Sequence, residues 1–244
     1  MPEKKVFDDK AENYDEEFTH SYIGHIQRKK IQAYISRCLL GKAPLEILEL
    51  NCGTGEDVAF LQQYGTVTAT DASEKMLEIC TQKNPGVQVQ FLDLEQPLPA
   101  HKKYDLVFSN FGGLNCISLR RMQALNDELA AILNPGGQLF FVLIHNWSLV
   151  EFAYFSSRLR FKKACRRSKG SATFGELSIH YYSPHILADM FPSFHLEEQQ
   201  PIGVVLAGEY MNRLGKRLRL QENHTTWLSP VLGADHFLFN FIRR

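Results

Sequence analysis

The sequence predicts an α/β fold in which a mostly parallel β-sheet is covered by helices on both faces. Two observations predict it: strand-like and helix-like segments alternate between residues 45 and 144, and the strand-like segments are almost continuously apolar. Alternation of this kind builds right-handed βαβ units whose strands lie parallel. Continuous apolar strands are expected because helices bury both faces of such a sheet. Ligands of these sheets bind beyond the carboxyl ends of the strands, where the strand order switches.

Each element follows from a local pattern. A short apolar run marks each strand, and a capping residue or a turn bounds each helix. The expected strands are, in order, Leu45–Leu50, Thr66–Thr70, Val87–Leu92, Tyr104–Ser109 and Gln138–Ile144. The expected helices are Val58–Tyr64, a helix capped by Ser73 that runs to Thr81, and Leu119–Leu133, which the turn Asn134-Pro135-Gly136-Gly137 ends.

Both ends of the chain add to this sheet. Residues 1–40 are expected to form a helical cap, because aromatic residues recur in the first twenty residues and Ile23–Leu40 has helical apolar spacing up to Gly41. Residues 148–177 interrupt the alternation and show no strand partner, so we interpret them as an inserted substrate lid. Beyond the insert, strands are expected at Ser178–Tyr182, Leu196–Leu206 and Phe237–Ile242, with a helix at Ser183–Phe191 and a late pair of strands forming an antiparallel edge.

Composition limits the class of function. The 244 residues suffice for one α/β domain with an additional segment. The 27 Lys+Arg balance the 27 Asp+Glu, and this net charge of zero argues against a dedicated nucleic-acid-binding protein. The five cysteines are scattered, so neither a metal site nor a disulfide framework is expected, and reduced thiols favour a cytoplasmic protein. The N-terminus is too charged for a signal peptide, and the longest apolar run, Leu139–Ile144, is too short to span a membrane.

The most informative segment is Glu46–Asp57, in which an apolar strand leads into Gly53 and Gly55 and then into a helix. Glycine lets the backbone come close to a polar ligand because it has no Cβ. A dinucleotide-binding loop would carry a third glycine where Val58 stands, and the neighbouring carboxylates of Glu56-Asp57 would repel a diphosphate. A Walker loop is excluded because no Gly-Lys-[Ser/Thr] follows. The loop therefore suits a ligand without phosphates.

These segments resemble, in order, the motifs of the class I S-adenosylmethionine (SAM)-dependent methyltransferases, particularly the methyltransferase type 11/25 domains. The resemblance runs from about Phe7 to Ile144, and Asn51 departs from the small residue that is common at its position. The segments that carry it are Phe7-Asp8…Ala11…Tyr14-Asp15, Leu48-Glu49-Leu50-Asn51-Cys52-Gly53-Thr54-Gly55, Thr70-Asp71-Ala72-Ser73-Glu74-Lys75-Met76-Leu77, Tyr104-Asp105-Leu106-Val107-Phe108 and Leu133-Asn134-Pro135-Gly136-Gly137.

The resemblance implies a single domain over residues 1–244 with a Rossmann-like, doubly wound, mostly parallel sheet of seven strands, an antiparallel edge strand and an inserted lid after strand five. It also implies SAM as the cofactor, with S-adenosylhomocysteine (SAH) as its product. The residues it assigns to the cofactor are Tyr14, Glu49, Asn51, Cys52, Gly53, Gly55, Asp71, Ala72, Met76, Asp93, Leu94, Ser109 and Asn110.

The expected roles follow from the places of these residues. Gly53 and Gly55 would approach the methionine part, with Glu49 near the sulfonium and Tyr14 over the carboxylate. Asp71 would accept both ribose hydroxyls, or it could simply cap the next helix. The adenine would pack against Ala72 and Met76 and bond to Asp93 and the Leu94 backbone, although Asp93 could equally be a turn residue.

Methyl transfer from a sulfonium is an in-line displacement, so the protein need mainly align the reactants and exclude water. No particular catalytic residue is required. The candidate proton acceptors are His145, at the end of strand five beside Trp147, and then His20, His180 and His185, each of which could instead be a surface or structural histidine. The segment Ser109–Asn115 lacks the Asn/Asp-Pro-Pro-Tyr/Phe of nucleic-acid amino-methyltransferases, which argues against methylation of a base.

The insert carries a basic run, Arg158–Lys169, with seven positive charges and no negative one. Such a run suits an acidic partner, which could be a carboxylate or phosphate of a small molecule, an acyl carrier protein, a membrane surface or RNA. It could also be the solvated face of a lid helix. A second basic cluster lies at Arg213, Lys216, Arg217 and Arg219, and aromatic residues of the insert (Phe152, Tyr154, Phe155 and Phe161) could line an apolar pocket.

We therefore expect a SAM-dependent methyltransferase that acts on oxygen, nitrogen or an activated carbon of a small molecule, with an anionic acceptor compatible with the basic insert. Three alternatives stay open. They are a methyltransferase for a carrier-protein-bound or RNA substrate, a SAM- or SAH-binding protein without turnover, and an NAD-dependent oxidoreductase, which the missing third glycine disfavours.

Overall fold

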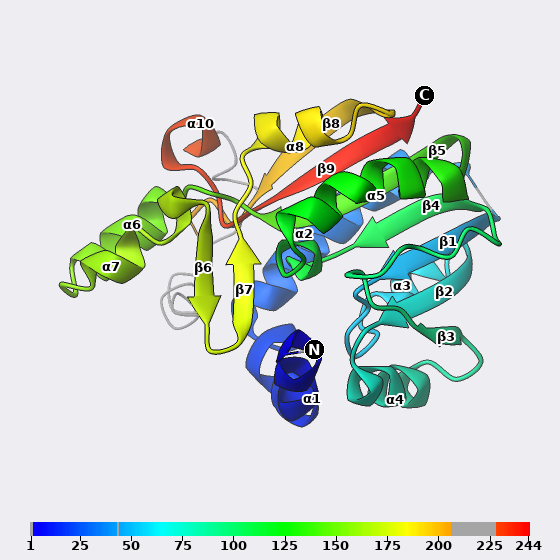
Figure 1. Cartoon of the computed structure of the whole chain (residues 1–244), viewed down its shortest axis with the longest axis horizontal. Helices are drawn as coiled ribbons and strands as arrows, with labels where there is room; N and C mark the ends of the chain where they lie inside the picture. Colours follow the sequence, from blue (N-terminus) through cyan, green and yellow to red (C-terminus); the bar gives the residue numbers. More distant parts are fainter. Residues whose placement is uncertain (1, 43, 206–227) are drawn as a thin grey trace.

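A seven-stranded sheet with the order β3-β2-β1-β4-β5-β9-β8 forms the centre of the molecule (Figure 1). The computed structural model describes residues 2–42, 44–205 and 228–244. The strands are β1 (Leu45–Leu50), β2 (Gly65–Asp71), β3 (Gln88–Phe91), β4 (Tyr104–Ser109), β5 (Leu133–Ile144), β8 (Phe194–Ile202) and β9 (His236–Arg243).

Strands β1 to β5 are parallel, whereas β9 is antiparallel to both β5 and β8. The predicted fold class is confirmed, and the late pair of strands is β8 and β9, with β8 outermost. The strand order reverses at β1, which has β2 on one side and β4 on the other. A crevice is expected beyond the carboxyl ends of these strands.

Helices cover both faces of the sheet and bury two apolar clusters. One cluster lies under α5 (Leu119–Ile132) and α8 (Pro184–Met190), and the other under α2 (Tyr22–Cys38), α3 (Val58–Leu61) and α4 (Glu74–Lys83). Strand β5 supplies both, because Phe141 belongs to the first cluster and Phe140 to the second. Side chains alternate between the faces of a strand, so consecutive apolar residues serve opposite cores. Burial of each phenyl ring stabilises the fold by roughly 1.5–3 kcal/mol.

The first forty residues form the expected helical cap. It consists of α1 (Pro2–Tyr14), a π-helical segment η1 (Asp15–Thr19) and α2, whose N-cap Ser21 accepts a 3.0 Å hydrogen bond from the Gly24 N–H. Helix α1 packs against α4 and lies beside β7 (Leu177–His180) at the open end of the sheet (Figure 1).

The insert of residues 148–177 contains α6 (Leu149–Ser156), α7 (Phe161–Ala164), the 3₁₀ segment η3 (Arg167–Lys169) and β6 (Ser171–Phe174). The expectation that it has no strand partner is wrong, because β6 pairs with β7 in an antiparallel hairpin. The strand predicted at Ser178–Tyr182 belongs to this hairpin and not to the main sheet. Gly175, with φ +62°, makes the turn possible.

Strand β5 begins earlier than predicted. Its first residue, Leu133, pairs with Tyr104, and the pairing resumes between Gln138 and Leu106, so that residues 134–137 bulge out of the strand. The predicted turn is therefore an irregularity within β5. None of the helices in the described ranges has the length and apolar character needed to span a bilayer.

Gly55 tests how tightly the loop after β1 packs against α4. A Cβ at Gly55, where φ is +77°, would lie 2.5 Å from the Cys80 Sγ and 2.6 Å from the Asn84 Nδ2. We expect Gly55→Ala to lower the free energy of unfolding by about 2–5 kcal/mol, from left-handed strain and overpacking together. The matched control is Gly86→Ala, because Gly86 has φ +85° but open space around it, and should cost about 1–2 kcal/mol. Equal losses in urea denaturation would contradict the packing argument.

Candidate functional site

A cavity of about 260 Å³ lies beyond the carboxyl ends of the parallel strands, and we call it the first cavity. Its lining comes from the segments that follow β1 to β4, from the end of β5, from the helical cap and from β7. The lining residues are Phe7, Tyr14, Asn51, Gly53, Asp71, Ala72, Ser73, Met76, Asp93, Leu94, Glu95, Asn110, Phe111, Gly112, Gly113, Cys116, Ile117, Ile144, Leu177 and Ile179.

The cavity brings together most of the predicted cofactor residues. Those that line it are Tyr14, Asn51, Gly53, Asp71, Ala72, Met76, Asp93, Leu94 and Asn110. The other four, Glu49, Cys52, Gly55 and Ser109, are not among its lining residues. All four are buried. Cys52 and Gly55 pack against Cys80 of α4, so these two residues support the loop and do not face the cavity.

Gly53 and Asp71 are hydrogen-bonded to each other in the lining of the first cavity. The Gly53 N–H donates to the Asp71 Oδ2 and the Ser73 N–H donates to its Oδ1, both at 2.9 Å. Burial raises the pKa of the Asp71 carboxyl above its usual range, and these backbone donors partly offset that rise. Gly53 has φ +54° and nothing within 4 Å of where a Cβ would be, so its backbone faces open space. Each carboxylate oxygen keeps acceptor capacity for a ligand.

The helical cap is fastened to this loop by two aspartates. Asp8 accepts a 2.5 Å hydrogen bond from the Ser73 hydroxyl, and Asp15 accepts one of 2.6 Å from the Thr54 hydroxyl. Lys83 of α4 also pairs with Asp15 at 2.9 Å. The cap thus closes the cavity through side chains that contact both the β1 and the β2 loops.

The two acidic residues that follow Gly55 do not face the first cavity. Glu56 pairs with Lys83 at 2.8 Å, and the buried Asp57 pairs with Arg28 at 3.1 Å and accepts a 2.8 Å hydrogen bond from the Asn110 Nδ2. Glu56 and Asp57 therefore do not repel a diphosphate as expected, because each carboxylate pairs with a cation and neither residue lines the cavity. Three other carboxylates line the cavity, while its described lining includes no lysine or arginine.

Glu49 lies behind the loop, 2 % exposed, and its Oε2 has no hydrogen-bond partner among the described residues. Burial, reinforced by the charge of Asp57, raises the pKa of Glu49 well above its ordinary value. A neutral carboxyl is the form that such an environment favours.

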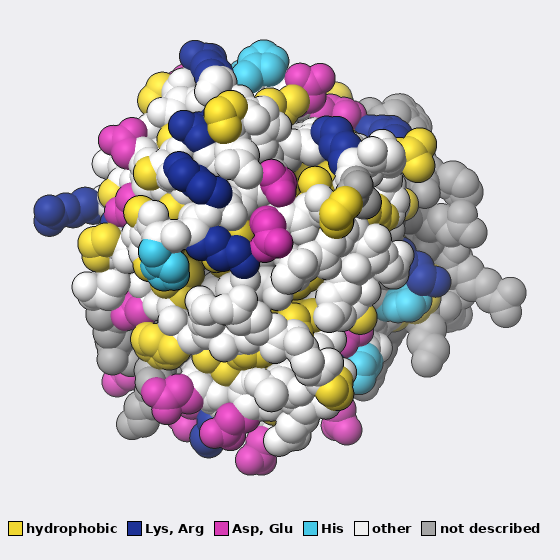
Figure 2. Space-filling model, turned by 90° about the vertical axis from the view of Figure 1, so that its right-hand side faces the viewer, with side chains coloured by type: hydrophobic (Ala, Val, Ile, Leu, Met, Phe, Trp, Pro, Cys, Tyr) yellow, Lys and Arg dark blue, Asp and Glu magenta, His cyan; other side chains and the backbone are white. Residues whose placement is uncertain are grey.

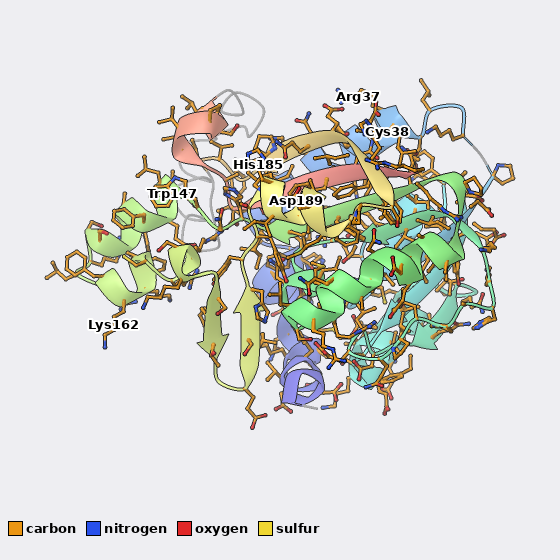
Figure 3. The ribbon with its side chains drawn as sticks, turned by 45° about the horizontal axis from the view of Figure 1, so that its top comes forward. Arg37, Cys38, Trp147, Lys162, His185 and Asp189 are labelled. Atoms are coloured by element: carbon orange, nitrogen blue, oxygen red, sulfur yellow. The ribbon has the colours of Figure 1, made fainter. Side chains whose placement is uncertain are left out.

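His145 lies away from the cavities. Its Nδ1 is 2.7 Å from the Trp147 carbonyl oxygen, and its ring lies 4.6 Å from that of Phe237. Burial lowers the pKa of His145, and Trp147 lies at the start of the insert (Figure 3). The imidazole does not line the first cavity or the second one described below, so this placement does not favour the predicted role as a base.

A second cavity of about 730 Å³ adjoins the first and is bounded by the cap and the insert. The two share Tyr14, Phe111 and Ile144 in their linings. The rings of Tyr14, Phe18 and Phe111 form a contact chain, with centroids 5.6 and 5.0 Å apart. Burial raises the pKa of the Tyr14 hydroxyl, so this boundary presents a neutral phenol.

Part of this boundary was not predicted from the sequence. Phe111 adopts φ +45°, and a Cβ on Gly113 would lie 2.5 Å from the Asn51 Cβ, so the loops after β1 and β4 are in close contact. Asn115 ties the same loop to β5, because its side chain accepts from the Ile144 N–H and donates to the Ile144 carbonyl. The Phe111-Gly112-Gly113 sequence directly after a strand was the available signal.

The basic run of the insert divides into two groups. Arg167 is buried and pairs with Glu151 at 2.6 Å and with Asp235 at 2.5 Å, and Arg166 also pairs with Glu151. This network joins the insert to the start of β9. The remaining cations of the run are exposed. The second basic cluster, Arg213 to Arg219, lies outside the described residues.

The comparisons with known proteins agree with this geometry. Residues 47–137 match a family model described as a methyltransferase domain. A malonyl-[acyl-carrier protein] O-methyltransferase of Enterobacter lignolyticus is 32 % identical over 127 residues, which cover 52 % of this chain and 49 % of that protein. The match thus spans about half the length of this curated relative.

Solved structures resemble nearly the whole chain. The DhpI–SAH complex has a TM-score of 0.62 at 17 % identity, covering 99 % of this chain and 95 % of that one. A SAM-dependent methyltransferase from Anabaena variabilis has 0.65 at 13 %, covering 100 % and 94 %. The N-methyltransferase NodS from Bradyrhizobium japonicum has 0.58 at 15 %, covering 89 % and 87 %. These likenesses show that the chain has the class I methyltransferase fold.

The buried Glu49 predicts a pH dependence of stability. With a folded pKa above the ordinary 4.5, the folded state keeps a proton that the unfolded state releases, so stability falls as pH rises above 4.5 toward the folded value. We expect Glu49→Gln to remove this fall, so that its stability gain over the parent grows with pH in urea titrations. The control is Glu46→Gln on the same strand, whose carboxylate pairs with Lys102 at the surface. A gain that stayed constant with pH would contradict the prediction.

The network around Arg167 predicts a large loss on its removal. In Arg167→Met, Glu151 and Asp235 each lose a buried ion-pair partner, so we expect unfolding to become easier by about 3–5 kcal/mol. Lys169→Met, an exposed change in the same η3 segment, should alter the free energy of unfolding by less than about 0.5 kcal/mol. Similar values for both variants in thermal and urea unfolding would show that the network is not structural.

Proposed function

We propose that this chain, which contains a class I methyltransferase domain, binds SAM in the first cavity and transfers its methyl group to a small molecule in the second. The observation that carries the proposal is the lining of the first cavity. Residues from four successive strand ends, assigned to a cofactor by motif alone, converge there around one space. Such a crevice at the point where the strand order reverses is where ligands bind in open α/β sheets.

The chemistry of the lining supports SAM. The cofactor carries a positive sulfonium and ammonium, a ribose with two hydroxyls and a flat adenine. Asp71, Asp93 and Glu95 give the cavity an acidic lining that suits the positive groups. Gly53 leaves room for close approach of the methionine part, and the buried Met76 and Leu94 give apolar surface for adenine.

Individual roles follow from these positions. Asp71, fixed by two backbone N–H groups, would accept the ribose hydroxyls, and Asp93 with the Leu94 backbone would bond the adenine amine. Tyr14 would cover the methionine end. When bound, SAM supplies an activated methyl group, so the chain's own task is to align the acceptor and exclude water. The aromatic boundary at Tyr14 and Phe111 suits that task.

A carrier-protein-bound acceptor is the second candidate. It is favoured by the relative that is named for malonyl-[acyl-carrier protein] and by the exposed cations of the insert. Turnover with malonyl-[acyl-carrier protein] but not with small-molecule acids would favour it over the first proposal.

Isothermal titration with SAH and with NADH tests the cofactor assignment. We expect SAH to bind and NADH not to bind. Asp71→Ala should weaken the binding of SAH by roughly 1.5–3 kcal/mol, a loss of affinity of about 10- to 150-fold, because hydrogen bonds to a charged group are lost. The control is Asp189→Ala, since Asp189 is exposed on α8 and lines neither cavity (Figure 3). Binding of NADH without SAH, or unchanged SAH affinity in Asp71→Ala, would reject the assignment.

A further inference from the structure

The two adjoining cavities carry opposite charge. The first is lined by three carboxylates and, among its described lining, by no lysine or arginine. The second is lined by six cationic side chains and only three carboxylates, counted over the described residues. The six cations are Lys10, Arg158, Arg160, Lys163, Arg166 and Arg167.

Two of these cations are already neutralised inside the protein. Arg166 and Arg167 pair with the buried carboxylates of Glu151 and Asp235, which are two of the three in the lining. Arg158, Arg160 and Lys163 have no carboxylate partner in the part of the chain that the structure describes, and Lys10 has none there either. The second cavity therefore keeps an excess of positive charge that its own walls do not balance.

Two of the unbalanced cations are held in place by aromatic rings. The Arg158 guanidinium lies 3.8 Å from the centroid of Tyr154 and donates a 3.3 Å hydrogen bond to the Tyr154 carbonyl oxygen. The Lys163 ammonium lies 4.7 Å from the centroid of Phe155. Cation–π contacts orient these groups and leave most of their N–H donors available. Both rings also line the cavity, so the charged groups adjoin an apolar wall.

Five of the six cations that line the second cavity come from the insert. On the side of the molecule away from the insert, lysine and arginine side chains lie among aspartate and glutamate in the upper part of the view, and acidic side chains predominate in the lower part (Figure 2). Within the basic run itself, Lys162 and Lys169 do not line the cavity, and Lys162 points away from the body of the protein (Figure 3). Charge that served solubility alone would have no reason to gather along one cavity wall beside aromatic rings.

We propose that the acceptor is a small molecule with an apolar body and a carboxylate or phosphate group, and that Arg158, Arg160 and Lys163 bind this anionic group. The inference rests on the proposed function, because it names the class of acceptor for the same enzyme. Arg158 offers planar paired donors that suit a carboxylate or phosphate, and Lys163 adds a point charge. Tyr154 and Phe155 contact the apolar body.

The test uses matched pairs of ligands. SAH-saturated protein is screened by ligand-observed NMR against C4–C10 aliphatic and aromatic carboxylates and phosphate monoesters, each beside the alcohol of the same skeleton. We expect acids to bind the parent protein at least about tenfold more tightly than their alcohols, as several partly exposed ion pairs together allow. In the double variant Arg158→Gln/Lys163→Gln, this preference should fall below about threefold by the same reasoning. The control Lys162→Gln/Lys169→Gln removes the same charge from the same run and should keep the preference.

Three results would overturn the inference: no acid binds the parent, alcohols bind as tightly as acids, or the control loses as much preference as the cavity variant. Titration of SAH into separate, SAH-free samples of the parent protein and of both variants distinguishes the two proposals. If the parent protein binds acids in preference to alcohols but does not bind SAH, the cofactor assignment is overturned and the anion-binding residues are not. Intact SAH binding without a preference for acids would overturn the anion site alone.

Discussion

The reversal of strand order at β1 is the constraint on which the rest of this structure depends. Because β2 and β4 leave β1 in opposite directions across the sheet, the connections that follow β1 and β4 run to opposite faces and leave a crevice between them. The loops that border this crevice need unusual backbone, which Asn51, Gly53 and Phe111 show with positive φ. The site is thus a consequence of topology, and the side chains decide what it binds.

Two additions from distant parts of the sequence close this crevice, and each is held through charged side chains. The helical cap is fastened through Asp8 and Asp15, whereas the insert is fastened through Arg167 between Glu151 and Asp235. The buried ion pairs of Arg167 add little net stability over apolar packing, but removing one partner is costly. They therefore fix where the cap and the insert lie, which is what a cavity made of separate segments requires.

Strands, turns and strand-end residues could be predicted, because they depend on local sequence pattern. Ion pairs and the pairing of distant strands could not be predicted, because they depend on tertiary contacts. Apolar runs and glycine turns predicted β1 to β5 and placed Gly53, Asp71 and Asp93 at strand ends, where the structure has them. The partners of charged residues were beyond reach. Glu56 and Asp57 looked like ligand-facing carboxylates but are neutralised by Lys83 and Arg28, which lie far away in the sequence. The β6–β7 hairpin and the inward turn of Arg167 were missed because tertiary contacts decide them.

The opposite charges of the two cavities determine which of the two proposed ligands each cavity favours. A cationic cofactor is attracted to the lining around Asp71 and repelled by the wall around Arg158, and the reverse holds for an anionic acceptor. Each ligand is then disfavoured in the other's cavity, so unproductive binding is reduced by repulsion as well as by shape. Between them, Tyr14, Phe111 and Ile144 form a boundary without charged side chains. In the proposed reaction, such a boundary would exclude water from the place of methyl transfer, and the charged residues would hold the two reactants in line.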